Sequence, residues 1–233
     1  RFFVVQEEEI ALVEAALTPQ ERVGRELMVV SNRRSAFNDT VASWRGLLQM
    51  PIVAIAGSVG KSTTKEMLAS IFVNDGVAIF TSAESQDSLE GIALNILSVT
   101  KQASIAVFEL GTRARGMLRE MAALLRPSFG IITSVDADYL PAFGSIEAVA
   151  DEMLTLFADF SPSQIGIICA DYLHLNRRTY SIPIVRYGLE GKKNVVTAEC
   201  SIEQQGGELV TRMQLSLFDR VGVVTLPGTH RGL

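Results

Sequence analysis

The sequence predicts an α/β fold, in which a mostly parallel sheet is flanked by helices and a small antiparallel β meander follows near the C-terminus. Three observations support this prediction. A short β-branched run at residues 52–56 is followed by a glycine-rich turn and a helical pattern. Strand-like runs then alternate with helical patterns to about residue 187, as in βαβ units. After about residue 195 only β-rich runs remain, separated by short polar or glycine-rich turns.

Residues 1–48 precede this alternation and form a segment of their own. Two strands are expected there, at residues 2–5 and 27–30. Two amphipathic helices are expected at residues 7–17 and 39–48. Asn38-Asp39-Thr40 is the predicted N-cap of the second helix, because short polar side chains accept hydrogen bonds from the first turn. Met50-Pro51 then ends the helical pattern, because the residue before a proline disfavours the helical conformation.

The alternating part is predicted to contain strands at residues 52–56, 77–80, 105–110, 129–133, 165–169 and 184–187. Helices are expected at residues 64–72, 89–99, 117–125 and 146–160, the last of them capped by Ser145. The closing meander is expected at residues 195–202, 208–217 and 221–226.

Composition narrows the class of protein. With 233 residues, 48% of them hydrophobic, the chain can bury a large core. The net charge of −5 and the absence of a basic cluster argue against a nucleic-acid partner. No run of about 18 apolar residues suggests a membrane span, and no signal peptide is visible. Cys169 and Cys200 lack zinc-ligand spacing, and we interpret them as buried thiols of a cytoplasmic protein.

The most informative segment is Gly57-Ser58-Val59-Gly60-Lys61-Ser62-Thr63, between the strand at 52–56 and a helix. This order predicts a phosphate-binding loop of the P-loop type, because glycines let backbone N–H groups approach a polyphosphate at a helix N-terminus. Lys61 would reach the terminal phosphates, and the Ser62 hydroxyl would hold Mg²⁺. The common pattern has a glycine where this chain has Ile55, so an ordinary glycine-rich turn is the alternative.

Four separated segments resemble the central ATP-binding domain of the Mur ligase family. They lie at residues 55–67, 108–112 with Gly116, 143–147 and 226–230, and the resemblance covers roughly residues 51–233. Three of these features look most like the family member that adds D-alanyl-D-alanine: the Gly-Ser-Val-Gly-Lys loop, the Lys-Glu-Met that follows it and the Glu-Leu-Gly segment. Residues 135–138 and 170–172 resemble the L-alanine-adding member instead.

The resemblance implies a domain organisation. Residues 1–48 would be the remnant of an N-terminal substrate-binding domain, and residues 49–233 would be the central ATP-binding domain. The family's C-terminal domain would be absent. Both ends look cut, because the chain begins at Arg1 and stops at Leu233, just after a glycine-rich turn.

The resemblance also implies an activity. The protein would be an ATP-dependent ligase of peptidoglycan synthesis that joins a carboxylate of a UDP-muramoyl precursor to an amine via an acyl phosphate. ATP and Mg²⁺ would be its cofactors, with Lys61 as the catalytic residue and Ser62 and Glu109 as metal ligands. Glu109 ends a predicted strand, where open α/β sheets bind ligands. The amino acid or dipeptide added and the oligomeric state stay open.

Some positions depart from the family pattern. Tyr139 stands where the family has a histidine metal ligand, and a neutral phenol is a poor ligand for Mg²⁺. Asp138 or Asp136 could substitute, and Asp138 is our hypothesis for the additional ligand. Met153 replaces a lysine that many members carry as a carbamate. Two alternatives therefore stay open: a degenerate Mur-ligase-like nucleotide-binding protein with a scaffold or regulatory role, and an unrelated P-loop kinase or NTPase.

Overall fold

A computed structural model describes residues 2–18, 20, 23–24, 26–83, 86–188, 196–217 and 220–227. The chain divides into two compact units, Arg1–Gln49 and Met50–Leu233. No helix within the described residues is long and apolar enough to cross a membrane.

The first unit pairs two short parallel strands, β1 (Phe2–Val5) and β2 (Glu26–Val29). The 3₁₀ turn η1 (Glu7–Glu9) leads into α1 (Ile10–Ala16), and the unit ends with α3 (Arg33–Leu47). The predicted cap of α3 at Asn38-Asp39-Thr40 is wrong. The Asn32 side chain caps the helix instead, accepting a hydrogen bond of 2.9 Å from the Ser35 N–H, so α3 begins at Arg33.

The second unit is built on one sheet, which has nine strands in the part of the chain described. Their order is β11-β10-β9-β8-β7-β6-β3-β5-β4. The strands are β3 (Ile52–Ala56), β4 (Ile79–Thr81), β5 (Ile105–Glu109), β6 (Phe129–Ile132), β7 (Ile165–Cys169), β8 (Ile184–Gly188), β9 (Val196–Gln205), β10 (Glu208–Leu217) and β11 (Arg220–Pro227). Strands β3 to β8 pair in parallel, which confirms the predicted α/β fold.

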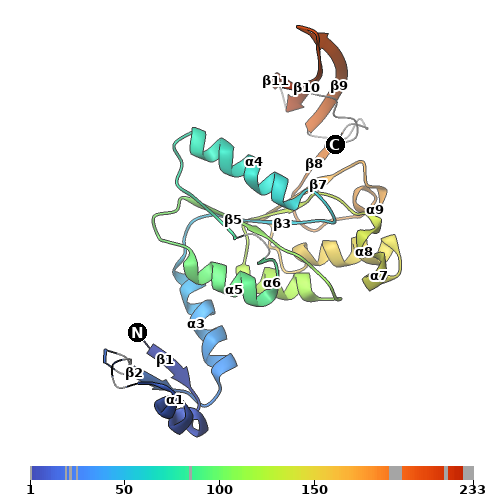
Figure 1. Cartoon of the computed structure of the whole chain (residues 1–233). Helices are drawn as coiled ribbons and strands as arrows, with labels where there is room; N and C mark the ends of the chain where they lie inside the picture. Colours follow the sequence, from blue (N-terminus) through green and yellow to red (C-terminus); the bar gives the residue numbers. More distant parts are fainter. Residues whose placement is uncertain are drawn as a thin grey trace. The chain divides into compact units, whose positions relative to one another are not determined.

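Helices cover both faces of the parallel part of the sheet. Figure 1 shows α4 on one face and α5, α6 and α8 on the other. The helical elements are α4 (Lys61–Asn74), α5 (Leu89–Ser98), α6 (Met117–Leu125), η2 (Ala137–Tyr139), α7 (Leu140–Phe143), α8 (Ile146–Leu154), η3 (Thr155–Phe157) and α9 (Leu173–Asn176). The helix expected at 146–160 ends at Leu154 and continues as η3, and the short α7 and α9 were not predicted.

The core explains why the strand at 52–56 is apolar throughout rather than alternating. β3 is central in the sheet and every residue of it is buried, because helices cover both of its faces. Val53 and Ile55 pack with Val107 of β5 and Ile131 of β6. Each such side chain contributes about 1.5–3 kcal/mol when it is fully buried. Cys169, at the end of β7, is a buried free thiol, as predicted, and burial raises its pKa.

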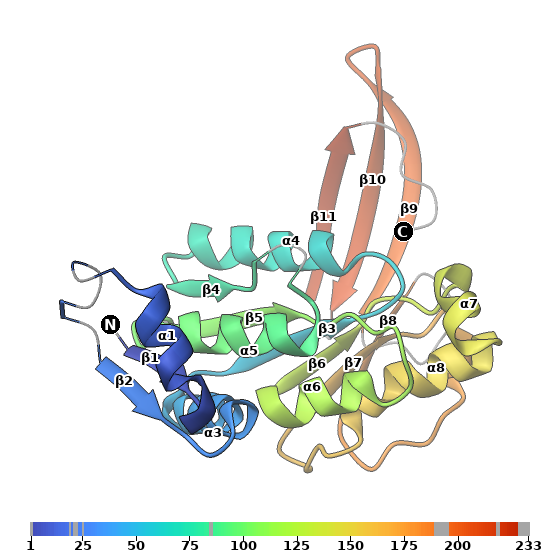
Figure 2. The same cartoon turned by 60° about the horizontal axis from the view of Figure 1, so that its bottom comes forward.

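The predicted antiparallel meander is confirmed at β9, β10 and β11, which lie side by side in Figure 2. Gly206 and Gly207 connect β9 to β10 with φ of 61° and 91°. A two-residue hairpin turn with positive φ at both positions favours glycine, which explains the glycine pair. β9 joins the parallel part through a short parallel pairing with β8.

Candidate functional site

The candidate site lies where three neighbouring parallel strands end. β3 lies between β5 and β6, so the segments that follow these strands meet at the carboxyl edge of the sheet. Open α/β sheets bind ligands at this edge, where the strand order reverses. Here the chain builds β4 and β5 on one side of β3 and then crosses to β6 on the other. The predicted phosphate loop follows β3, and Glu109 is the last residue of β5.

The loop after β3 has the backbone of a phosphate-binding loop. Gly57 and Gly60 have φ of 141° and 86°, which disfavour other residues. A Cβ on Gly57 would lie 2.1 Å from Thr133 Oγ1. Gly60 is the N-cap of α4, which begins at Lys61 rather than at the predicted Thr64. The first N–H groups of α4 have no partner within the helix, so they can bind an anion at this end.

Residues after β6 brace this loop. The Thr133 hydroxyl donates to the carbonyl oxygen of Val59 at 2.6 Å, and the Val59 N–H donates to Ser134 Oγ at 2.8 Å. The Asp136 N–H donates to Ser58 Oγ at 2.9 Å. These bonds hold the loop in its conformation. Sequence reasoning missed Thr133 and Ser134, although their position just after a strand beside β3 was a usable signal.

Lys61 lies along the phosphate loop. Its Nζ donates to the carbonyl oxygen of Gly57 at 2.8 Å and lies 3.4 Å from the Tyr139 hydroxyl oxygen. The ammonium also lies over the Tyr139 ring, 5.8 Å from its centroid. The tertiary structure therefore brings Tyr139 to the loop as a partner of Lys61. A phosphate oxygen carries a full charge and would be a stronger acceptor for Lys61 than the backbone carbonyl.

Two of the three predicted metal ligands are in contact. Ser62 Oγ donates to Glu109 Oε2 at 2.8 Å, which joins the start of α4 to the end of β5. The other carboxylate oxygen, Oε1, is 2.6 Å from Lys65 Nζ. A hydroxyl and a carboxylate oxygen are hard ligands of the kind that Mg²⁺ prefers, so Ser62 and Glu109 together fit this ion.

Asp138, the third predicted metal ligand, is exposed on η2 and is not part of the contact between Ser62 and Glu109. Throughout the described part of the chain, no three His, Cys, Asp or Glu side chains are arranged to hold a metal ion. Asp136 instead accepts a hydrogen bond of 3.2 Å from the Tyr172 hydroxyl. Burial, together with the negative charge of Asp136, raises the pKa of Tyr172 to about 12, so this tyrosine stays a neutral donor. Met153 packs in the core.

A buried carboxylate that the sequence did not reveal supports the segment after Glu109. Glu152 of α8 is 4% exposed and accepts hydrogen bonds from Thr112 Oγ1 and from the N–H groups of Gly116 and Leu118. These N–H groups belong to the start of α6, so Glu152 satisfies donors that have no partner within that helix. A cleft of about 380 Å³ lies beside it, lined by Arg115, Gly116, Ser145, Glu147, Ala148, Asp151, Glu152 and Thr155.

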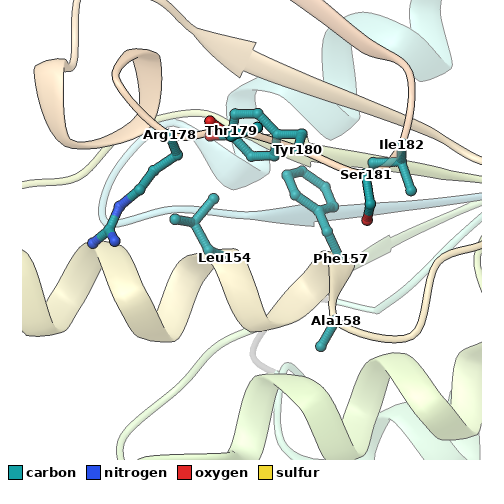
Figure 3. Close-up of a pocket in the computed structure, with 8 residues that line it drawn as sticks. All are labelled: Leu154, Phe157, Ala158, Arg178, Thr179, Tyr180, Ser181 and Ile182. Atoms are coloured by element: carbon teal, nitrogen blue, oxygen red, sulfur yellow. The ribbon is translucent and has the colours of Figure 1, made fainter.

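A second cavity, of about 230 Å³, lies away from the phosphate loop. Its lining comes from the end of α8, from η3 and from residues 178–182, and the last two segments precede β7 and β8. Figure 3 shows the rings of Phe157 and Tyr180 next to each other, and their centroids are 6.3 Å apart. No predicted site residue lines this cavity, and it lies toward the amino ends of these strands, so we do not assign it to the nucleotide.

Two sequence relatives of this chain carry the same protein name. The chain is 30% identical over 207 residues to the UDP-N-acetylmuramoyl-tripeptide–D-alanyl-D-alanine ligase of Escherichia coli (strain K12), covering 87% of this chain and 45% of that protein. It is 29% identical over 178 residues to the ligase of the same name from Synechocystis sp., covering 74% of this chain and 39% of that protein. The chain thus spans less than half the length of these two relatives.

Solved structures share the fold. The chain superposes on MurF ligase from Thermotoga maritima, solved in complex with ADP, with a TM-score of 0.80 and 19% identity. The superposition covers 99% of this chain and 56% of that one. MurF from Acinetobacter baumannii gives a TM-score of 0.76 at 21% identity, covering 97% of this chain and 52% of that one.

The last of the four segments that resemble the family lies at residues 226–230. Its residues 228–230, His230 among them, lie outside the described part of the structure. The sequence of this segment still falls within the family match. The Mur ligase middle domain matches residues 55–231, which is more than half of the chain. This match includes the braced phosphate loop, Glu109 and the meander. The chain therefore belongs to the Mur ligase family, through that family's middle domain.

Proposed function

We propose that this chain is the ATP-binding part of an ATP-dependent ligase of peptidoglycan synthesis. The enzyme joins a carboxylate of a UDP-muramoyl tripeptide to the amine of D-alanyl-D-alanine via an acyl phosphate. One observation carries the proposal: the braced loop with Lys61 and the contact between Ser62 and Glu109 lie at one edge of the sheet. The names of the sequence relatives support the substrates.

The residues of the site have separate tasks in this reaction. Phosphoryl transfer needs alignment and charge neutralisation more than a covalent protein group. The N–H groups of the loop and of the α4 N-terminus orient the phosphates, and Lys61 exchanges its carbonyl acceptors for phosphate oxygens. Ser62 and Glu109 would hold the metal ion, which when bound would supply further positive charge beside the phosphates. Asp138 remains our hypothesis for an additional ligand.

The domain assignment belongs to the same proposal. Residues 1–48 would be part of the domain that binds the UDP-muramoyl substrate, and residues 49–233 would bind ATP. The division of the chain into the compact units Arg1–Gln49 and Met50–Leu233 is compatible with this assignment.

The first prediction tests the nucleotide site. Replacing Lys61 by alanine should weaken ATP binding by about 10- to 100-fold, because one charge-assisted hydrogen bond contributes about 1.5–3 kcal/mol. Calorimetric titration with ATP and Mg²⁺ measures this loss. Lys101→Ala removes an equal charge from an exposed turn and should bind ATP like the wild type. Equal affinity in Lys61→Ala and wild type would refute the phosphate-loop assignment.

Turnover separates the ligase from a degenerate nucleotide-binding protein. The complete gene product should release ADP only when UDP-N-acetylmuramoyl tripeptide and D-alanyl-D-alanine are both present. ATP binding without ADP release across UDP-muramoyl substrates would support the degenerate protein instead. Tyr139 and Met153 are the two positions to exchange first in that case, for histidine and lysine respectively.

A further inference from the structure

Lys65 is a buried lysine that the proposed mechanism does not use. It lies in α4, one helical turn after Lys61, and only 5% of it is exposed. Lysine is almost never buried unless it is paired. Its ammonium donates to the carbonyl oxygen of Ser82 at 3.1 Å and lies 2.6 Å from Glu109 Oε1.

This contact divides the two oxygens of Glu109 between different partners. Oε1 is fully buried and has no hydrogen-bond partner besides the ion pair with Lys65. Oε2 faces the phosphate loop, where Ser62 Oγ donates to it at 2.8 Å. The Ser82 hydroxyl oxygen accepts a hydrogen bond of 3.0 Å from the Glu109 N–H, which fixes the end of β5 as well. A metal ion at the loop can therefore reach Oε2 but not Oε1.

The ion pair also sets the charge of the site. Glu109 and Lys65 are opposite unit charges in contact, with side-chain exposures of 13% and 6%, so solvent screens them little. A divalent cation approaching Oε2 is attracted by the carboxylate and repelled by the nearby ammonium. The phosphates of a bound nucleotide would add the negative charge that the ion pair lacks.

We propose that Lys65 is a positioning residue that makes metal binding depend on nucleotide binding. By occupying Oε1, it holds Glu109 as a ligand through Oε2 alone. By balancing the carboxylate charge, it keeps the site from binding a divalent cation before the phosphates arrive. This inference rests on the proposed function, because it assumes that a nucleotide and a divalent cation bind at the loop.

Manganese binding tests the proposal without any measurement of turnover. Mn²⁺ is titrated into the whole chain, with and without a non-hydrolysable ATP analogue, and free Mn²⁺ is followed by electron paramagnetic resonance. The wild type should bind Mn²⁺ at the loop only in the presence of the analogue. Lys65→Gln and Lys65→Met should bind Mn²⁺ without nucleotide about tenfold or more tightly than the wild type, because the repelling charge is gone.

Three further variants separate positioning from a purely structural role. Lys65→Arg keeps the charge and should behave like the wild type. The double variant Lys65→Gln with Glu109→Gln should lose the gain in Mn²⁺ affinity, because the carboxylate charge that attracts the ion is removed as well. Lys101→Met makes the same change of charge at an exposed turn and should not alter Mn²⁺ binding.

Two results would overturn the inference. One is tight Mn²⁺ binding by the wild type without nucleotide, which needs no variant and so does not depend on how well any variant folds. The other is an unchanged nucleotide-free Mn²⁺ affinity in a folded Lys65→Gln. If the wild type binds the analogue and either result is obtained, only this inference fails. If the wild type binds no analogue at all, the proposed function fails with it.

Discussion

At the scale of the residue, Gly57 is a position of the site that only glycine fits well. Its φ of 141° is unfavourable for other residues, and an added Cβ would lie 2.1 Å from Thr133 Oγ1 and 2.9 Å from the Ser134 nitrogen. The same two residues hold Val59. A side chain at position 57 would therefore push the loop away from the residues that brace it.

Gly57→Ala should destabilise the protein by about 2 kcal/mol or more and should also weaken ATP binding, because backbone strain and a clash act together. Urea unfolding and calorimetric titration measure the two effects. Gly76→Ala is the matched control. Gly76 has a φ of 72° but open space around it, so this variant should lose about 1 kcal/mol and keep its ATP affinity. Equal losses in both variants would show that the contact with Thr133 does not matter.

Tyr139 illustrates how a residue that departs from the family pattern can still belong to the site. The sequence placed it at a metal position, for which a phenol is poorly suited. In the structure its hydroxyl lies 3.4 Å from Lys61 Nζ and its ring packs against Phe143. Its position therefore gives it a contact with the predicted catalytic lysine.

At the scale of the element, the start of α6 depends on a side chain from another helix. Its N-cap is Gly116, which has no side chain to accept a hydrogen bond. Glu152 of α8 takes over this task with both carboxylate oxygens. A buried carboxylate at a helix N-terminus is favourable because it meets the positive end of the helix dipole.

Glu152→Ala should reduce the free energy of unfolding by about 2–4 kcal/mol, because several buried donors lose their acceptor. Urea unfolding followed by circular dichroism measures the change. Glu147→Ala, in the same helix but with a side chain that is 65% exposed, should stay within about 0.5 kcal/mol of the wild type. A similar small effect for Glu152→Ala would contradict the capping role.

At the scale of the whole molecule, the hydrogen bonds that brace the phosphate loop, Lys61 and Ser62 all join residues of the unit Met50–Leu233. Residues 50–233 alone should therefore bind ATP with an affinity within about threefold of the whole chain, since no contact of the loop is lost. Calorimetric titration of both proteins measures this. Loss of ATP binding by a folded 50–233 fragment would mean that the first unit contributes to the site.

Much of the fold was predictable because its signals are local. The boundaries of α6, β7 and β10 match their predictions. The signals are the apolar spacing within each segment, Pro127 just after α6 and the glycine turn just before β10. The start of α3 was wrong because two asparagines, Asn32 and Asn38, offer equivalent caps. The short α7 and α9 were missed because four residues carry too little periodicity.

By itself, the sequence determined the alternation of strands and helices, the phosphate loop and the family. Each of these is recognised from patterns or motifs that lie within short stretches of the chain. Only the tertiary structure decided which side chains meet at the carboxyl edge. The pairing of Lys65 with Glu109 and the bracing of Val59 by Thr133 join segments far apart in the chain. Such contacts depend on the strand order β5-β3-β6, which is set by how the whole sheet packs rather than by any single segment.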